Sequence, residues 1–216
     1  MAITYSNCWS WAMQADVLLT GAGTSLAGAR DQVPLLLTPR LFADDRGFFF
    51  ESWNQRSFAA ALGLPPEQAP SFVQDNHSRS SRGVLRGLHY QLPPHPHGKL
   101  VRCIGGEIFD VAVDLRRSSS TFGQWVGAHL SAENQQQLWV PAGFAHGFLT
   151  LSEQAEVLYK TTDFWSKDCE RAIRWDDPRL QVGWPLQRLG GIEPLQAEKD
   201  ASAPWLAELA EADLFP

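Results

Sequence analysis

From Pro34 onward the chain is a succession of short apolar or alternating runs, each closed by Gly, Pro, Asn or Asp. Such runs are typical of β-strands, because side chains alternate across a strand and turn residues interrupt it. About ten of these runs in one domain predict an all-β sandwich or jelly-roll barrel. The expected strands are residues 35–42, 47–53, 71–76, 83–91, 99–104, 107–115, 121–130, 136–141, 147–152 and 155–162.

Few other local signals interrupt this pattern. Gly105-Gly106 stands between two of the runs and predicts a hairpin turn. Two segments, residues 56–64 and 203–215, have helical rather than alternating spacing. In the second, a tryptophan and three leucines lie close to helical spacing, so we expect a terminal helix that docks on the barrel.

The length and charge of the chain limit its function class. Its 216 residues suit one domain with a sizeable core. Lys and Arg number 18 against 24 Asp and Glu, a net charge of −6 without any basic run. Sequence-independent binding to nucleic acid is therefore not expected. A phosphorylated small ligand is compatible with this charge, because a few basic side chains in one pocket suffice to bind phosphate.

The N-terminal segment and the cysteines bear on location. Residues 1–31 contain much Gly, Ala and Ser and lack the basic start of a secretion signal, so we predict a flexible extension before a domain at 32–216. No apolar run approaches the roughly 18 residues needed to span a bilayer. Cys8, Cys103 and Cys169 match neither a disulfide framework nor a metal site, which favours a reducing, cytoplasmic compartment.

Three histidines lie within nine positions, at His89, His95 and His97. Metal-binding jelly rolls often place H-x-H before a nearby Glu and a distant His, and His146 in a P-x-G-x-x-H element matches the last of these. However, the first acidic residue after His97 is Glu107, ten positions on. Prolines around His95 and His97 also indicate an irregular loop, whereas metal ligands are held rigidly. We therefore expect no metal and no cofactor, with His95 and His97 as surface residues.

Seven segments together resemble, in order, the motifs of the dTDP-4-dehydrorhamnose 3,5-epimerases. They read FADDRGFFFESW, FVQDNHSRSSRGVLRGLHYQ, GKLVRC, GEIFDVAVDLR, QLWVPAGFAHGFL, VLYKTTDFWS and RWDDP. The resemblance covers about residues 34–207. It implies a cupin-type jelly roll, or double-stranded β-helix, with a few short helices. It also implies a homodimer that needs no metal and whose substrate is a dTDP-sugar.

The implied reaction epimerises dTDP-4-dehydro-6-deoxy-D-glucose at C3 and C5 to dTDP-4-dehydro-L-rhamnose, in dTDP-L-rhamnose and polysaccharide biosynthesis. The C4 ketone acidifies the hydrogens at C3 and C5, so the reaction needs a base, an acid across the ring and a donor to the enolate oxygen. By resemblance His89 is the base, since imidazole titrates near neutral pH, and Asp200 orients it. Tyr159 is then the acid, and Lys99 contacts the enolate.

The remaining motif positions are expected to bind the substrate. Two arginines among them suit a diphosphate, because guanidinium presents a planar fork of donors to phosphate oxygens. A histidine is expected as a polar pocket residue, and Phe48 is a candidate for stacking on the base. These binding positions are Arg46, Glu51, Gln74, Asn76, Arg86, His146, Glu170 and Lys199.

Three alternatives stay open at the level of sequence. The first is an epimerase that acts at C3 only, the second a catalytically silent cupin that binds nucleotide sugars, and the third a metal-dependent cupin oxygenase or isomerase. The joint presence of His89, Tyr159, Lys99 and Asp200 argues against the silent binder, because binding alone needs no acid and base.

Overall fold

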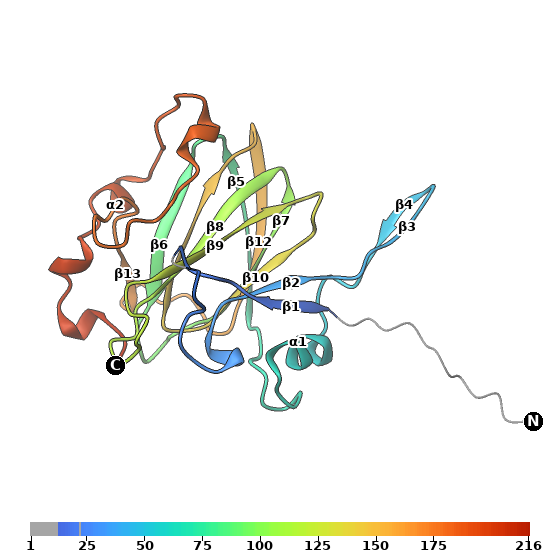
Figure 1. Ribbon diagram of the computed structural model, residues 1–216, viewed down its shortest axis with the longest axis horizontal. Helices are drawn as coiled ribbons and strands as arrows, with labels where there is room; N and C mark the ends of the chain where they lie inside the picture. The colour runs from blue at the N-terminus through green and yellow to red at the C-terminus, as the bar shows by residue number, and fades with distance from the viewer. Residues whose placement is uncertain (1–12, 22) are drawn as a thin grey trace, which may run out of the picture.

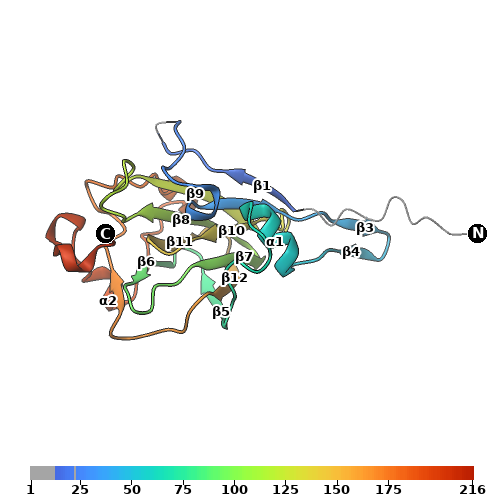
Figure 2. The same ribbon diagram turned by 90° about the horizontal axis from the view of Figure 1, so that it is seen from below.

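The computed structural model describes residues 13–21 and 23–216, in which two antiparallel β-sheets pack face to face (Figures 1 and 2). The six-stranded sheet contains, in order across it, β1 (Gln14–Val17), β2 (Leu35–Thr38), β10 (Gln137–Val140), β7 (Lys99–Gly105), β12 (Gln154–Thr161) and β5 (Gln74–Ser81). The five-stranded sheet contains β13 (Glu170–Ala172), β6 (Leu85–Gln91), β11 (Phe144–Thr150), β8 (Glu107–Asp114) and β9 (Trp125–Ser131). The predicted all-β, cupin-type jelly roll is confirmed.

A third, two-stranded sheet lies apart from these two. β3 (Phe42–Asp44) and β4 (Gly47–Phe49) form a hairpin that projects from the body of the molecule (Figures 1 and 2). Phe48 on this hairpin is 58% exposed. The predicted strand 47–53 therefore ends earlier, at Phe49, and the chain then turns back toward the six-stranded sheet.

The strand predicted at 71–76 is displaced, since β5 runs from Gln74 to Ser81. Its residues alternate between intermediate and exposed side chains along most of its length, and nearly all of them are polar. The side chains of Gln74, Asn76 and Ser78 line cavities rather than the apolar core. Hydrophobic alternation is consequently missing from β5, which is why the pattern did not reveal its boundaries.

The predicted helix at 56–64 is confirmed as α1 (Gln55–Leu62). Asn54 caps it, because its side-chain oxygen accepts hydrogen bonds from two backbone N–H groups of the first turn. Gly63 ends it in the left-handed conformation at φ 74°. The buried Phe58 ring packs against the Trp139 indole at a centroid distance of 5.1 Å, which anchors α1 on the six-stranded sheet.

The terminal helix predicted at 203–215 is wrong. The structure has two separate 3-10 turns there, η3 (Leu206–Glu208) and η4 (Glu211–Asp213). The Leu206 N–H donates to the buried Asp177 carboxylate at 2.6 Å, and the Phe215 backbone bonds to the chain at residues 115–117. These contacts with the barrel hold the segment extended, so they override its helical spacing. The last α-helix is instead the short α2 (Glu198–Ala201).

Among the described residues, a β-strand lies before the predicted domain boundary at residue 32. β1 pairs with β2 along its whole length, from Gln14 opposite Thr38 to Val17 opposite Leu35. Two further short 3-10 helices, η1 (Arg30–Gln32) and η2 (Leu186–Leu189), lie in connections. Residues 1–12 and 22, and with them Cys8, lie outside the described residues. Among the residues that are described, no helix has the length and apolar character to cross a membrane.

One close contact fixes the start of β7. A Cβ on Gly98 would overlap the Trp139 indole, so only glycine fits there. The Gly98 N–H donates to Thr162 Oγ1 at 2.8 Å, and the Thr162 N–H donates to the Gly98 carbonyl at 3.0 Å. The residues on either side, His97 and Lys99, are therefore held to both the core and the end of β12.

Candidate active site

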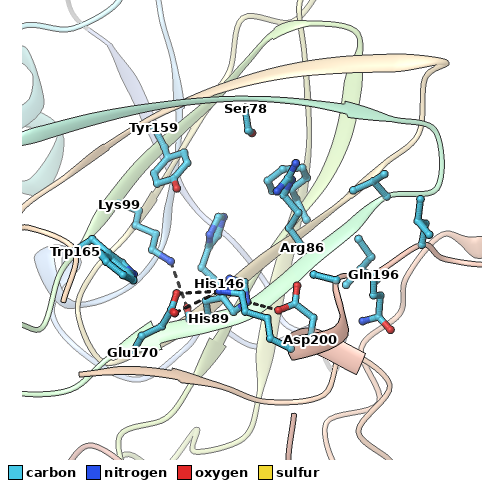
Figure 3. Close-up of a pocket in the computed structure, with 16 residues that line it drawn as sticks. Ser78, Arg86, His89, Lys99, His146, Tyr159, Trp165, Glu170, Gln196 and Asp200 are labelled. Carbon is cyan, nitrogen blue, oxygen red and sulfur yellow. Dashed lines mark hydrogen bonds and ion pairs between the residues drawn. The ribbon is translucent and has the colours of Figure 1, made fainter. Parts of the chain in front are cut away.

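A cavity of about 540 Å³ lies between the two sheets. The five-stranded sheet contributes His89 and His146 to its lining, and the six-stranded sheet contributes Lys99 and Tyr159. Figure 3 shows Tyr159 across the cavity from His89. The short helix α2 closes one side with residues that include Asp200. This cavity is the candidate active site.

His89 and Asp200 form the best-defined pair in the cavity. His89 Nε2 lies 2.7 Å from Asp200 Oδ1, and the Gly87 N–H donates to Asp200 Oδ2 at 3.3 Å. Burial alone would raise the pKa of the Asp200 carboxyl, but the hydrogen bond and charge of His89 together with the Gly87 N–H lower it. Because a carboxylate only accepts, Nε2 carries the hydrogen in this bond, which leaves Nδ1 of a neutral ring as proton acceptor.

Tyr159 and Lys99 occupy the opposite wall, on β12 and β7. Burial raises the pKa of the Tyr159 phenol, so the phenol is protonated at neutral pH. Burial also lowers the pKa of the Lys99 ammonium to about 8, although the charges of Asp110 and Glu170 oppose this. Lys99 Nζ donates to the His89 carbonyl at 3.3 Å. The wall thus presents one neutral hydrogen donor and one amine whose charge is easily lost.

His146 is held by a carboxylate that the sequence analysis did not name. Its Nε2 lies 2.6 Å from Asp110 Oδ1, and both residues are buried. Burial lowers the pKa of the His146 imidazole, with Asp110 opposing the shift, so the ring is neutral at neutral pH. The signal was present, since Asp110 interrupts the apolar run between the two ends of β8.

Two of the predicted binding residues with basic side chains, Arg86 and Lys199, line the cavity. Arg86 Nε donates to Ser80 Oγ at 3.0 Å, and Lys199 Nζ lies 3.3 Å from the Glu170 carboxylate. All three of Arg86, Glu170 and Lys199 line the cavity. The structure therefore gathers two basic side chains in the cavity that contains His89 and Tyr159.

Gln74 and Asn76 line a smaller adjoining hollow of about 250 Å³. Tyr159 and Trp165 border both this hollow and the main cavity. Gln74 Nε2 donates to Asn76 Oδ1 at 2.9 Å, and the Trp165 N–H donates to Gln74 Oε1 at 3.2 Å. His97 also lines the hollow. Its predicted place on the surface is thus wrong, whereas His95 is half exposed and ion-paired to Asp163.

Two predicted binding residues are not brought into the cavity of their own chain. Arg46 lies at the turn of the β3–β4 hairpin, is largely exposed and pairs with Asp44. Glu51 accepts hydrogen bonds from Ser57 and Asn54 at the start of α1, at 3.1 Å each. Both lie outside the two hollows that contain the other predicted positions.

Sequence reasoning missed several lining residues, and three of these carry polar side-chain atoms, namely Ser78, Trp165 and Gln196. Trp165 is 55% exposed at the rim, and its position in the TDFWS stretch after a strand was the available signal. Ser78 Oγ and Gln196 Nε2 line the cavity and are buried with no hydrogen-bond partner in the described part of the chain. Neither residue had a distinguishing local pattern.

The residues at 13–21 and 23–216 contain no group of three or more His, Cys, Asp or Glu side chains arranged to hold a metal ion. His89 and His146 each face a single carboxylate instead of sharing one ligand position. The donor set of the cavity is thus arranged for hydrogen bonding and proton transfer.

Comparison with known proteins agrees with this geometry. The model of the family described as dTDP-4-dehydrorhamnose 3,5-epimerase matches residues 32–208. The chain belongs to this family. The family expected from the seven motifs is thereby confirmed.

Individual members of the epimerase family match over most of the chain. It is 62% identical over 182 residues to the dTDP-4-dehydrorhamnose 3,5-epimerase of Pseudomonas aeruginosa, which covers 84% of this chain and 94% of that protein. The structure of a dTDP-6-deoxy-D-glucose-3,5-epimerase from Legionella pneumophila, in complex with dTDP-4-keto-L-rhamnose, has a TM-score of 0.80 at 42% identity, covering 94% and 98% of the two chains. A 3'-monoepimerase from Streptomyces bikiniensis in complex with dTDP-quinovose has a TM-score of 0.72 at 33% identity, covering 81% and 84%.

Proposed function

We propose that the protein converts dTDP-4-dehydro-6-deoxy-D-glucose to dTDP-4-dehydro-L-rhamnose by epimerising C3 and C5, as a step of dTDP-L-rhamnose biosynthesis. The observation that supports this most is that a carboxylate-held imidazole, His89, and a protonated phenol, Tyr159, line one cavity from opposite sheets. Epimerisation needs this opposition, because a proton leaves one face of the ring and another arrives on the other face.

In the proposed mechanism, His89 takes the proton from C3, and in a second round from C5. The electron pair of the C–H bond moves toward C4, and the ketone oxygen becomes an enolate. Lys99 donates to that oxygen and offsets its charge. Tyr159 then gives its proton to the opposite face of the carbon. Each round leaves His89 protonated and Tyr159 deprotonated, and exchange with solvent restores both.

Asp200 acts through His89 in this mechanism. Its carboxylate fixes the ring hydrogen on Nε2 and stabilises the imidazolium that forms when Nδ1 takes a proton. The lowered pKa of Asp200 keeps it ionised throughout the neutral range, so the pair is ready to accept a proton.

The nucleotide half of the substrate is proposed to bind beside these groups. Arg86 and Lys199 would contact the diphosphate, while Glu170 orients Lys199. Trp165 offers an exposed indole face at the rim for stacking on the base. Gln74 and Asn76 lie below it in the adjoining hollow.

Arg46 and Glu51 reach a nucleotide only if a second copy supplies them, because both lie outside the cavity of their own chain. We propose a homodimer in which a partner covers the exposed hairpin, and Phe48 with it. Mixing Arg46→Ala with His89→Ala protein after subunit exchange tests this arrangement. About a quarter of wild-type activity should return, since half of the dimers would be mixed and each would hold one intact site. No recovery in demonstrated mixed dimers would contradict it.

The reaction is tested by running it in deuterated water with dTDP-4-dehydro-6-deoxy-D-glucose and following the sugar by NMR. Deuterium at both C3 and C5, with appearance of the L-rhamno product, is the expected result. Absence of label at either carbon in the presence of folded protein would overturn the proposal. His89→Ala provides the matched control, because it removes the proposed base and leaves the nucleotide contacts.

A second candidate function is epimerisation at C3 alone. It is favoured by one observation, the likeness of the chain to a 3'-monoepimerase at a TM-score of 0.72. The same labelling experiment separates the two candidates, since the narrower enzyme would label only C3.

We further propose a cytoplasmic location. Cys103 and Cys169 are both buried and free, which suits a reducing compartment. Fractionation of cells that produce the protein, with a cytoplasmic marker enzyme as control, would test this.

A further inference from the structure

The small hollow contains a histidine to which the proposed reaction gives no role. His97 lines it together with Gln74, Asn76 and Trp165. Nδ1 of His97 is buried and has no hydrogen-bond partner within residues 13–21 and 23–216. A buried polar atom left without a partner costs free energy and calls for an explanation, which in proteins is often a functional role of the side chain.

The imidazole is held in place by the chain around it. Prolines at 94 and 96 restrict the preceding loop, and Gly98 follows immediately, packed on the Trp139 indole. The hydrogen bonds between Gly98 and Thr162 join the same point to the end of β12. A side chain carried by so fixed a backbone is preorganised for binding.

The ring is also neutral. Burial and the nearby Lys99 ammonium together lower the pKa of His97 to about 3, while Asp163 acts in the opposite direction. The Asp163 carboxylate is itself engaged by His95 Nδ1 at 3.2 Å. A neutral imidazole offers one N–H donor and one lone-pair acceptor.

The hollow suits an uncharged planar ring. Its lining consists of neutral groups, namely two amides, an imidazole, a hydroxyl, a phenol and an indole. The cations that suit a diphosphate, Arg86 and Lys199, line the main cavity instead. Trp165 borders both spaces, so a base stacked on it would present its polar edge to the hollow.

We propose that His97 is a further binding residue, whose imidazole hydrogen-bonds the polar edge of the pyrimidine base beside Gln74 and Asn76. This inference rests on the proposed function and adds to it a determinant of base specificity. The imide edge of thymine, an N–H between two carbonyls, matches a neutral imidazole and two amides. Cytosine replaces one carbonyl by an amino group and loses the N–H, so it would fit the same groups less well.

The expected effect concerns binding and not chemistry. Loss of one hydrogen bond in a dry site corresponds to about a tenfold loss of affinity. The base is remote from the reacting carbons, so ground state and transition state should lose the same contact. We therefore expect KM to rise about tenfold while kcat changes less than about threefold.

The test is calorimetric titration of the full chain with dTDP and dCDP, together with steady-state kinetics. The variants are His97→Ala and His97→Gln, and the matched control is His95→Ala, which changes the same loop outside the hollow. For His97→Ala we expect dTDP to bind about tenfold more weakly and the preference for dTDP over dCDP to shrink. Glutamine supplies a donor and an acceptor, so it should restore most of the loss. His95→Ala should match the wild type.

The outcomes separate this inference from the proposed function. If the wild type turns over the sugar substrate and His97→Ala binds dTDP with unchanged affinity, the inference alone is overturned. Equal loss in the alanine and glutamine variants, with lowered melting temperatures, would assign His97 a purely structural role and overturn it as well. If the wild type binds dTDP without turnover, the proposed function fails while the His97 result still decides this inference. A wild type that binds no dTDP would overturn both.

Discussion

The two walls of the cavity place their titratable side chains in different electrostatic surroundings. On the five-stranded sheet, His89 and His146 each face a carboxylate, at 2.7 and 2.6 Å. On the six-stranded sheet, Tyr159 and Lys99 make no hydrogen bond to a carboxylate anywhere in the described chain. One wall therefore pairs its titratable groups with carboxylates, and the other wall does not.

The difference assigns a direction to proton movement. A carboxylate beside an imidazole stabilises the imidazolium, so Asp200 supports the role that we propose for His89 as the base. Burial without a carboxylate keeps the Tyr159 phenol protonated and raises its pKa, so that wall holds a proton until a stronger base forms beside it. The enolate carbon is such a base.

The largest expected effect comes from removing the group on either wall that we propose to move the proton. His89→Ala and Tyr159→Phe should each lower kcat by about 10²- to 10⁴-fold, the usual contribution of a general acid or base. Melting temperature should change little for Tyr159→Phe, which keeps the ring. Steady-state assays of both variants check this. More than about a tenth of wild-type activity in His89→Ala would remove the residue from the mechanism.

His129→Ala is a suitable control for the histidine variant. His129 is about half exposed, pairs with Glu107 on the surface and lies outside the cavity. It should leave kcat unchanged, so a loss there would indicate a general effect of removing an imidazole.

The second effect tests whether the carboxylate partner is what distinguishes the His89 wall. Asp200→Asn keeps the size of the side chain and removes the charge, so kcat should fall by about 100-fold or more. The acid limb of the kcat/KM profile should also move to lower pH, because the imidazolium loses its stabilising charge. A fall in kcat with an unmoved acid limb would reduce Asp200 to a structural residue.

The third effect concerns the burial of Lys99. Its pKa, lowered by burial to about 8, means that the ammonium is present below that pH and lost above it. If Lys99 stabilises the enolate, kcat should fall by up to about tenfold per pH unit above about 8. Tyr159 does not explain such a limb, because its pKa is raised above the ordinary value of 10. Lys99→Arg keeps the charge and should move the limb to higher pH, and a limb that stayed near 8 would contradict the assignment.

The smallest expected effect is on KM and concerns the contact between Ser80 and Arg86 at the edge between the walls. Ser80 is buried, 5% exposed, and accepts a hydrogen bond from Arg86 Nε at 3.0 Å. Ser80→Ala should loosen Arg86 and raise KM for the dTDP-sugar about two- to fivefold with kcat unchanged, as expected for one modest hydrogen bond. Kinetics at saturating and limiting substrate separate the two constants. A lowered kcat with unchanged KM would mean that Ser80 does not act through Arg86.

How far the sequence predicted the molecule also differs between the two sheets. Strands such as β8 and β11 follow apolar runs, because both of their faces are buried. The predicted position of β5 was wrong because its inward face lines a cavity and its outward face is solvated. The strand therefore has no alternation of apolar residues that a sequence pattern could detect. The terminal helix was wrong because contacts with Asp177 and Leu115 outcompete local spacing.

The candidate site was predictable where a motif names the residue, and less so where distant packing decides. The motifs named the members of the His89 and Asp200 pair, which the structure brings together. They also named Arg46, but a single sequence does not reveal that the hairpin carries it away from its own cavity. His97 was interpreted as a surface residue because prolines precede it. The contact that holds this point of the chain comes from the Trp139 indole, 41 positions after Gly98, and the local sequence does not reveal it.

The contact between Gly98 and Trp139 links the packing of the core to the geometry of the active site. The Trp139 indole fixes the position of the Gly98 backbone, which lies between His97 and Lys99. A shift of that ring would therefore displace the Lys99 amine and the His97 imidazole together. Conservative substitutions around α1 that the fold tolerates would thus change turnover and nucleotide preference first. Substitutions in this core are consequently expected to affect catalysis even at positions that no substrate touches.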